Sequence, residues 1–117
     1  EKFWRWGDTK GNVESRFSKD ELLTNLTIYW ATQTITSSVR FYYEYGREQR
    51  LQGRMEVPTA ALMAEHDMVA PPREVSERMY NLKRWNLSPV GGHFLEWEEP
   101  QLVAEDMRAF FSSLRQP

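Results

Sequence analysis

The sequence predicts an α/β fold in which parallel strands alternate with helices. Residues 55–63 form a short apolar run that is typical of a buried parallel strand. The double proline at Pro71 and Pro72 opens a helical stretch, and a second apolar segment follows it. Asp67 comes just after the first segment and His93 just after the second, and α/β folds place catalytic groups at such strand ends.

The order strand, acid, helix, strand, histidine, helix is that of the closing segment of an α/β-hydrolase fold, which supplies the acid and the base of a nucleophilic triad. No nucleophile elbow is visible in the chain. We therefore expect the C-terminal part of an α/β-hydrolase, with the end of a helical cap, the last two parallel strands and the final helices. Residues 1–54 are assigned to the cap and residues 55–117 to the core. We expect the chain to be a fragment, or one product of a cleavage, whose larger partner segment carries the nucleophile.

The first elements are expected to belong to the cap. Residues 1–7 read as the end of a helix that stops at a glycine, and the polar residues 8–17 read as a loop. Ser18 and Glu21 have the spacing of a capping box. The helix that they start carries an apolar stripe and fades around residues 32–34.

A second cap helix is predicted from residues 36–38, whose hydroxyl groups offer N-caps, to Gly46. It carries a cluster of aromatic residues. Residues 47–54 are charged and polar, and we interpret them as the crossing from the cap to the core.

Two further elements are predicted in the core beyond the first strand and its following helix. The second strand is predicted within residues 82–90, with residues 85–88 as its expected extent, because Pro89 disfavours a long central ladder. The last helix should begin near Pro100. Its core-facing stripe would consist of Val103, Met107, Phe110, Phe111 and Leu114.

The composition excludes several classes of function. Hydrophobic residues make up 40% and aromatic residues 14% of the chain, which indicates a core and an aromatic pocket wall. The net charge of −2 gives no electrostatic basis for nucleic-acid binding. No apolar run approaches the roughly 20 residues of a membrane span. The lack of cysteine excludes disulfides and thiol chemistry.

The localisation stays unknown, with a slight preference for the cytoplasm. The oligomeric state is open, and a homodimer is one of the options.

His93 is the candidate general base. It follows two glycines, whose backbone freedom lets the imidazole reach a cleft, and a neutral imidazole is well matched to proton transfer near pH 7. An isolated histidine is more often a local loop residue, but the acid-bearing loop upstream favours the catalytic interpretation. Asp67 is the candidate partner that would orient the ring, and nearby Glu65 competes with it. His66 is interpreted as a pocket-rim residue.

Tyrosines and glutamates are the other candidates. Tyr42, Tyr43 and Tyr45 lie on one predicted helix, where a phenol can donate to a developing alkoxide, although aromatic packing is the commoner role of such a cluster. Glu98 and Glu99 precede a predicted helix start, where negative charge suits the helix dipole, and we interpret them as structural. No metal-ligand spacing, phosphate loop or dinucleotide fingerprint is present.

Several strings, taken together and in order, resemble a known family. In the first half they are residues 18–26, 29–30, 34–38 and 40–42. In the second half they are residues 57–59, 91–94, 98–100 and 102–106. They resemble the cap, the strand before the acid, the histidine segment and the final helix of the microsomal-type epoxide hydrolases, which include the juvenile-hormone epoxide hydrolases.

The resemblance implies a triad acid at Asp67, a base at His93 and one of two cap tyrosines at Tyr42. The second tyrosine, the nucleophilic aspartate and the oxyanion hole would belong to the N-terminal half of the same enzyme, which would be the partner of this chain. The implied reaction converts a small apolar epoxide into a vicinal diol through a covalent alkyl-enzyme ester, with no cofactor and no metal.

Three alternatives stay open. Ester or haloalkane hydrolysis would use the same acid and histidine, but only epoxide opening needs a proton donor such as Tyr42 on the cap. A non-catalytic binding protein on the same fold would lack the aspartate nucleophile. A helical interaction module standing alone is disfavoured, because two strands without the rest of their sheet leave edges unpaired.

Overall fold

The computed structural model describes residues 1–47 and 53–115. The chain forms two compact units. The core unit comprises residues 1–16 and the chain from Gly53 onward, and the helical unit is the described part of residues 17–52. This division differs from the expected boundary after residue 54, because residues 1–16 pack with the C-terminal half. Residues 48–52, within the predicted crossing, lie outside the described part.

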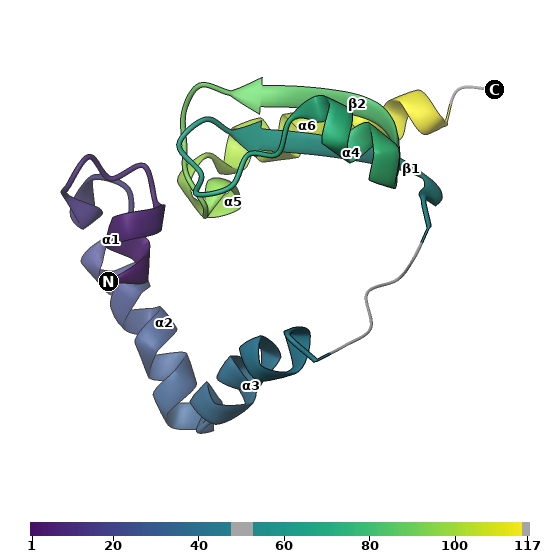
Figure 1. The fold of residues 1–117 in the computed structure, drawn as a ribbon. Coiled ribbons are helices and arrows are strands. Elements are labelled where there is room, and N and C mark those ends of the chain that lie inside the picture. Colours follow the sequence, from purple (N-terminus) through teal and green to yellow (C-terminus); the bar gives the residue numbers. More distant parts are fainter. Residues whose placement is uncertain (48–52, 116–117) are drawn as a thin grey trace. The chain divides into compact units, whose positions relative to one another are not determined.

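The centre of the core unit is a pair of parallel strands, β1 (Met55–Ala64) and β2 (Tyr80–Ser88). They are joined through α4 (Arg73–Met79), so the order is the strand–helix–strand that the sequence predicts. Figure 1 shows the two strands side by side, with both arrows pointing the same way. The register pairs Ala64 with Ser88, and both strands therefore end at the same edge.

Proline explains two details of this pair. Pro58 lies in β1 at one of the irregularities of the register, where the ladder tolerates a residue that has no N–H. The prediction that β2 covers only residues 85–88 is wrong, since the strand begins at Tyr80. Pro89 follows the last residue of the strand, so it ends the ladder without interrupting it.

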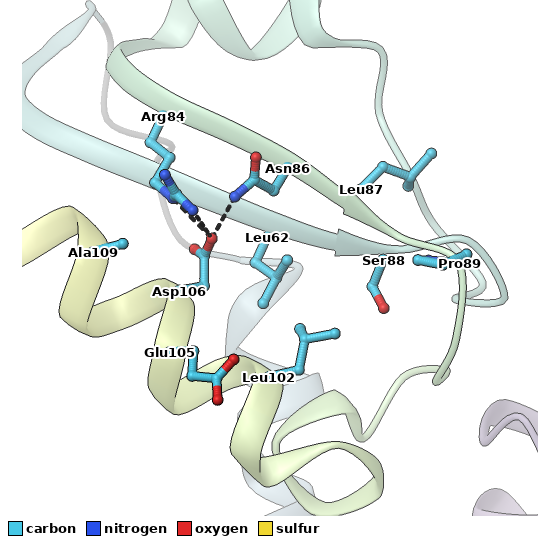
Figure 2. Close-up of a pocket in the computed structure, with 10 residues that line it drawn as sticks. All are labelled: Leu62, Arg84, Asn86, Leu87, Ser88, Pro89, Leu102, Glu105, Asp106 and Ala109. Atoms are coloured by element: carbon cyan, nitrogen blue, oxygen red, sulfur yellow. Dashed lines mark hydrogen bonds and ion pairs between the residues drawn. The ribbon is translucent and has the colours of Figure 1, made fainter.

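Two helices follow the second strand. The short helix α5 (Leu95–Glu98) was not predicted, whereas α6 (Pro100–Leu114) begins at its proline as expected. Of the predicted apolar stripe of α6, Phe110 is the residue that is buried within this chain. About half of each of Met107 and Phe111 stays exposed. Views from two sides place α4 and α6 on opposite faces of the strand pair (Figures 1 and 2).

The first residues of the chain build a compact lobe of the core unit. The helix α1 (Lys2–Trp6) ends at a glycine, as predicted, and the 3-10 helix η1 (Val13–Ser15) lies within the predicted loop. The indole of Trp4 donates to the carbonyl oxygen of Gly11 at 3.1 Å. The hydroxyl of buried Thr9 donates to the carbonyl oxygen of Trp4 at 2.8 Å. These bonds fold the loop back onto α1.

The helical unit consists of α2 (Lys19–Thr32) and α3 (Ile35–Tyr45). The capping box is confirmed, since the Ser18 hydroxyl accepts from the Glu21 amide and the Glu21 carboxylate accepts from the Ser18 amide. The predicted N-cap at residues 36–38 is wrong, because these residues already lie in the first turn of α3. Among the helices of the described residues, none has the length and apolar character that crossing a membrane requires.

Candidate active site

The candidate site is built at the edge where the two parallel strands end. After β1 the chain turns at once, with the Glu65 amide donating to the carbonyl oxygen of Ser88 at 2.9 Å. The Asp67 amide donates to the carbonyl oxygen of Ala64 at 3.2 Å and closes the turn. The loop that carries the acid is therefore bonded to the end of the strand that leads to His93.

Asp67 and His93 form a direct pair. The Oδ1 atom of Asp67 lies 3.0 Å from Nδ1 of His93, and the same oxygen accepts from the Met68 amide at 2.6 Å. About 39% of the His93 side chain and 22% of the Asp67 side chain are exposed. With the carboxylate ionised, this contact favours the tautomer that carries its proton on Nδ1 and leaves Nε2 as the basic atom.

The two competing acids differ in their contacts. Asp67 contacts the imidazole, whereas Glu65 is exposed and holds only the strand end through its backbone. His66 is exposed as well, in keeping with a rim position. The catalytic roles of Asp67 and His93 remain predictions.

The backbone of His93 is held by the N-terminal lobe. Its amide donates to the carbonyl oxygen of Trp6 at 2.8 Å, and the two rings meet edge to face at 5.2 Å between centroids. A Cβ atom on Gly92 would lie 2.5 Å from the same carbonyl oxygen, so only glycine allows this approach. Gly91 has a φ of 83°, in the left-handed region. The two glycines are thus required for different reasons.

Glu98 has a role that the sequence interpretation missed. Its side chain is fully buried, and Oε1 accepts from the amides of Gly92 at 3.1 Å and Phe94 at 3.2 Å. Its Oε2 accepts from the Asp8 amide at 2.7 Å. A carboxylate near a helix start was expected to act on the helix dipole. Glu98 is instead the last residue of α5, and its carboxylate binds the backbone on both sides of His93.

Arg16 forms ion pairs with three acidic residues near His93, namely Asp8, Glu98 and Glu99. Its guanidinium lies 3.1 Å from Oδ2 of Asp8, 2.9 Å from Oε1 of Glu99 and 3.9 Å from Oε2 of Glu98. The pKa of Arg16 is raised above its usual value, because burial, which would lower it, is outweighed by the hydrogen bond to Asp8 and the charges of Glu99 and Asp8. The arginine therefore stays charged beside a buried carboxylate.

Aromatic rings cover the side of the histidine loop that faces α1. Phe3 stacks on Phe94 with 4.5 Å between ring centroids, and it meets Trp97 edge to face at 5.3 Å. The Nζ atom of Lys2 lies 3.9 Å from the ring centroid of Trp6. This packing shields the loop on which His93 lies.

The candidate tyrosines lie in the other compact unit. Tyr42 lies on α3 and is 66% exposed. Its ring meets that of Phe41 edge to face at 5.8 Å, and Tyr43 packs under the guanidinium of Arg47 at 3.6 Å. No contact within the helical unit assigns a proton-donating role to any of the three tyrosines.

A groove of about 460 Å³ lies elsewhere on the core unit, between β2 and α6. Figure 2 shows Arg84 and Asn86 pointing from the strand to the carboxylate of Asp106 on the helix. Neither Asp67 nor His93 lines this groove, and two of its charged groups, Arg84 and Asp106, pair with each other at 2.7 Å. The groove is therefore not the candidate catalytic site. In the described part of the chain, no group of three or more acidic or histidine side chains could hold a metal ion.

Comparisons with known proteins show which proteins the chain resembles in sequence and in structure. No family model matches it. It is 37% identical over 128 residues to "Epoxide hydrolase 1" of Sus scrofa, covering 99% of this chain and 28% of the relative. It is 37% identical over 109 residues to "Juvenile hormone epoxide hydrolase 2" of Ctenocephalides felis, covering 87% of this chain and 23% of the relative.

A solved structure agrees with these sequences. The juvenile hormone epoxide hydrolase from the silkworm Bombyx mori superposes with a TM-score of 0.87 at 31% identity, covering 97% of this chain and 32% of that chain. The fold is therefore the C-terminal part of an α/β-hydrolase. The chain is homologous to epoxide hydrolases of the microsomal and juvenile-hormone type, and it spans about a quarter of the length of the curated relatives.

Proposed function

We propose that the complete protein containing this chain is an epoxide hydrolase, which adds water to a small apolar epoxide and releases a vicinal diol. The observation that carries the proposal is the contact of 3.0 Å between Asp67 and Nδ1 of His93, in a chain homologous to enzymes of that name. The histidine lies at the end of a parallel strand pair, where α/β folds place catalytic groups.

The reaction would proceed in two steps. An aspartate carboxylate outside this chain attacks one epoxide carbon, the carbon–oxygen bond breaks, and Tyr42 with a second tyrosine donates a hydrogen bond and a proton to the oxygen that leaves. This gives an alkyl-enzyme ester with a neighbouring hydroxyl group. No cofactor and no metal take part in this scheme.

His93 would act in the second step. Its Nε2 atom removes a proton from water, and the resulting hydroxide adds to the ester carbonyl. The ester bond then breaks, the proton of the new carboxyl group passes to the departing alkoxide, and the diol leaves with the aspartate regenerated as a carboxylate. The proton held on His93 returns to the tyrosine that gave up its proton in the first step, which restores both residues. Asp67 stabilises the imidazolium and fixes its tautomer throughout.

The N-terminal half of the same enzyme is the partner that this chain requires. Support comes from apolar side chains that the chain leaves about half or more exposed, among them Val57 on β1 and Met107 and Phe111 on α6. A sheet of two parallel strands also leaves ladder edges without partners. Residues 1–117 expressed alone should therefore unfold without a cooperative urea transition, and a sharp transition would contradict this part of the proposal.

The proposed function is tested by intact-mass spectrometry of the complete protein carrying His93→Gln. After incubation with styrene oxide, a mass gain of one substrate is expected, because the first step proceeds and the second is blocked. A protein with the native sequence should turn over the same epoxide without lasting mass gain. If neither protein reacts with several epoxides, the activity is not epoxide hydrolysis, and ester substrates become the next test.

A further inference from the structure

Three consecutive backbone amides around the candidate base are all held by specific acceptors. The amides of Gly92 and Phe94 donate to Oε1 of Glu98, and the amide of His93 between them donates to the carbonyl oxygen of Trp6. No side chain other than Glu98 binds the backbone on both sides of the histidine in the described contacts.

Glu98 also binds the turn that carries the second acceptor. Its Oε2 atom binds the Asp8 amide at 2.7 Å, two residues after Trp6 in the same turn. The carbonyl oxygen that holds His93 and the amides that flank it are therefore tied to one carboxylate. A displacement of this carboxylate would move both supports of the imidazole together.

We propose that Glu98 is a positioning residue for the histidine-dependent step, which holds the His93 backbone through its bonds to the amides of Gly92, Phe94 and Asp8. The inference rests on the proposed function, because it concerns the step in which His93 activates water. Glu98 touches no reacting atom. It acts through the backbone that sets where the imidazole lies relative to the ester.

Charge explains why a carboxylate occupies this position. A buried ionised group is costly unless it is paired and hydrogen-bonded. Glu98 has three amide donors and the guanidinium of Arg16 at 3.9 Å, so both of its oxygens are satisfied. A neutral amide could not replace it. One end of glutamine is a donor, and in either orientation that end would face a backbone N–H.

The test separates the two chemical steps in the complete protein. Glu98→Gln should leave the rate of ester formation, measured in the first turnover by rapid-quench mass spectrometry, close to that of the native protein. Ester hydrolysis should slow by up to about 100-fold, because a small misplacement of a catalytic group has effects of this size. The covalent ester should therefore accumulate at steady state.

The matched control is Glu99→Gln, which removes the same charge from the neighbouring residue. Glu99 also pairs with Arg16, at 2.9 Å, but it binds neither amide that flanks His93. Its ratio of the two rates should stay near the native value. A purely structural role for Glu98 would lower the amount of active protein and reduce both rates equally, and an unchanged ratio in Glu98→Gln would overturn the proposal.

Two further measurements keep the outcome decisive. If Glu98→Gln does not fold, Glu98→Asp retains the charge but is too short to span the amides of Asp8 and Gly92, and it should shift the ratio in the same direction. A native ratio in that variant would overturn the proposal.

The His93→Gln protein serves as the check on the reaction itself. If it traps an ester while the Glu98 variants keep the native ratio, only the positioning role fails, and if no protein forms an ester, the proposed function fails.

Discussion

The backbone amide of His93 donates a hydrogen bond to the carbonyl oxygen of Trp6 at 2.8 Å. The contact joins the candidate base to the first helix of the chain and explains why residues 1–16 belong to the core unit. It also requires that no side chain stand between the two backbones, a condition that Gly92 meets.

Gly92→Ala should therefore destabilise the complete protein by about 1–3 kcal/mol, the usual cost of overpacking. The new methyl group would lie 2.5 Å from the Trp6 carbonyl oxygen and 2.7 Å from the Asp8 nitrogen, both of which are backbone atoms. Urea denaturation measures the change. The matched control is Gly46→Ala at the end of α3, where an added Cβ meets no atom within 4 Å. Equal stability of the two variants would contradict the packing argument.

Asp67→Asn tests the orienting carboxylate. The amide keeps the shape of the side chain but no longer stabilises the imidazolium or selects its tautomer, so we expect epoxide turnover to fall on the order of 1,000-fold or more. The covalent ester should accumulate at the same time, as seen by intact mass. Glu65→Gln, on the same loop but away from the imidazole, should retain native turnover. If the Glu65 variant loses activity and the Asp67 variant does not, the acid has been misassigned.

Tyr42→Phe tests the cap acid. Loss of one of two proton donors should slow ester formation on the order of 10- to 100-fold, while the stability of the protein stays unchanged. Single-turnover mass spectrometry measures this rate directly. Tyr43→Phe is the control on the same helix, because Tyr43 packs against Arg47 through its ring face, which phenylalanine retains. Unchanged ester formation in Tyr42→Phe would remove this residue from the mechanism.

The ion pair between β2 and α6 should contribute to stability and not to chemistry. Asp106→Ala leaves Arg84 and Asn86 without their shared acceptor and should cost about 1–3 kcal/mol in urea unfolding. Glu105→Ala, whose exposed carboxylate only accepts from Gln101, should change stability by less than about 0.5 kcal/mol. The ratio of ester formation to ester hydrolysis should be native in both variants. A changed ratio in Asp106→Ala would connect this groove to the active site.

The parts of the fold that depend on local pattern could be predicted from the sequence. The capping box of Ser18 and Glu21 needs only residues three apart, and it is present as expected. The meeting of Asp67 and His93 follows from a simple rule, since parallel strands joined by a helix end at one edge. The predicted end of β2 at Ser88 is right, whereas its start is wrong, because β2 follows α4 directly and no turn residue marks the change from helix to strand.

The role of Glu98 could not be read in the same way. Its place before Pro100 indicated a structural charge that suits the dipole at a helix start. Its burial depends on the Asp8 amide and on Arg16, both far away in the sequence. The double glycine before His93 was the available signal, because a close approach of two backbones requires a partner that holds them together.

The bond between the Asp8 amide and the Glu98 carboxylate joins residues 90 positions apart. Such a long-range contact closes a large loop and is therefore expected to form late in folding. During synthesis, the first helix and its loop leave the ribosome well before Glu98 has been made. The histidine loop can therefore take its final position only after Glu98 has been made, when the first helix has long been free to fold locally.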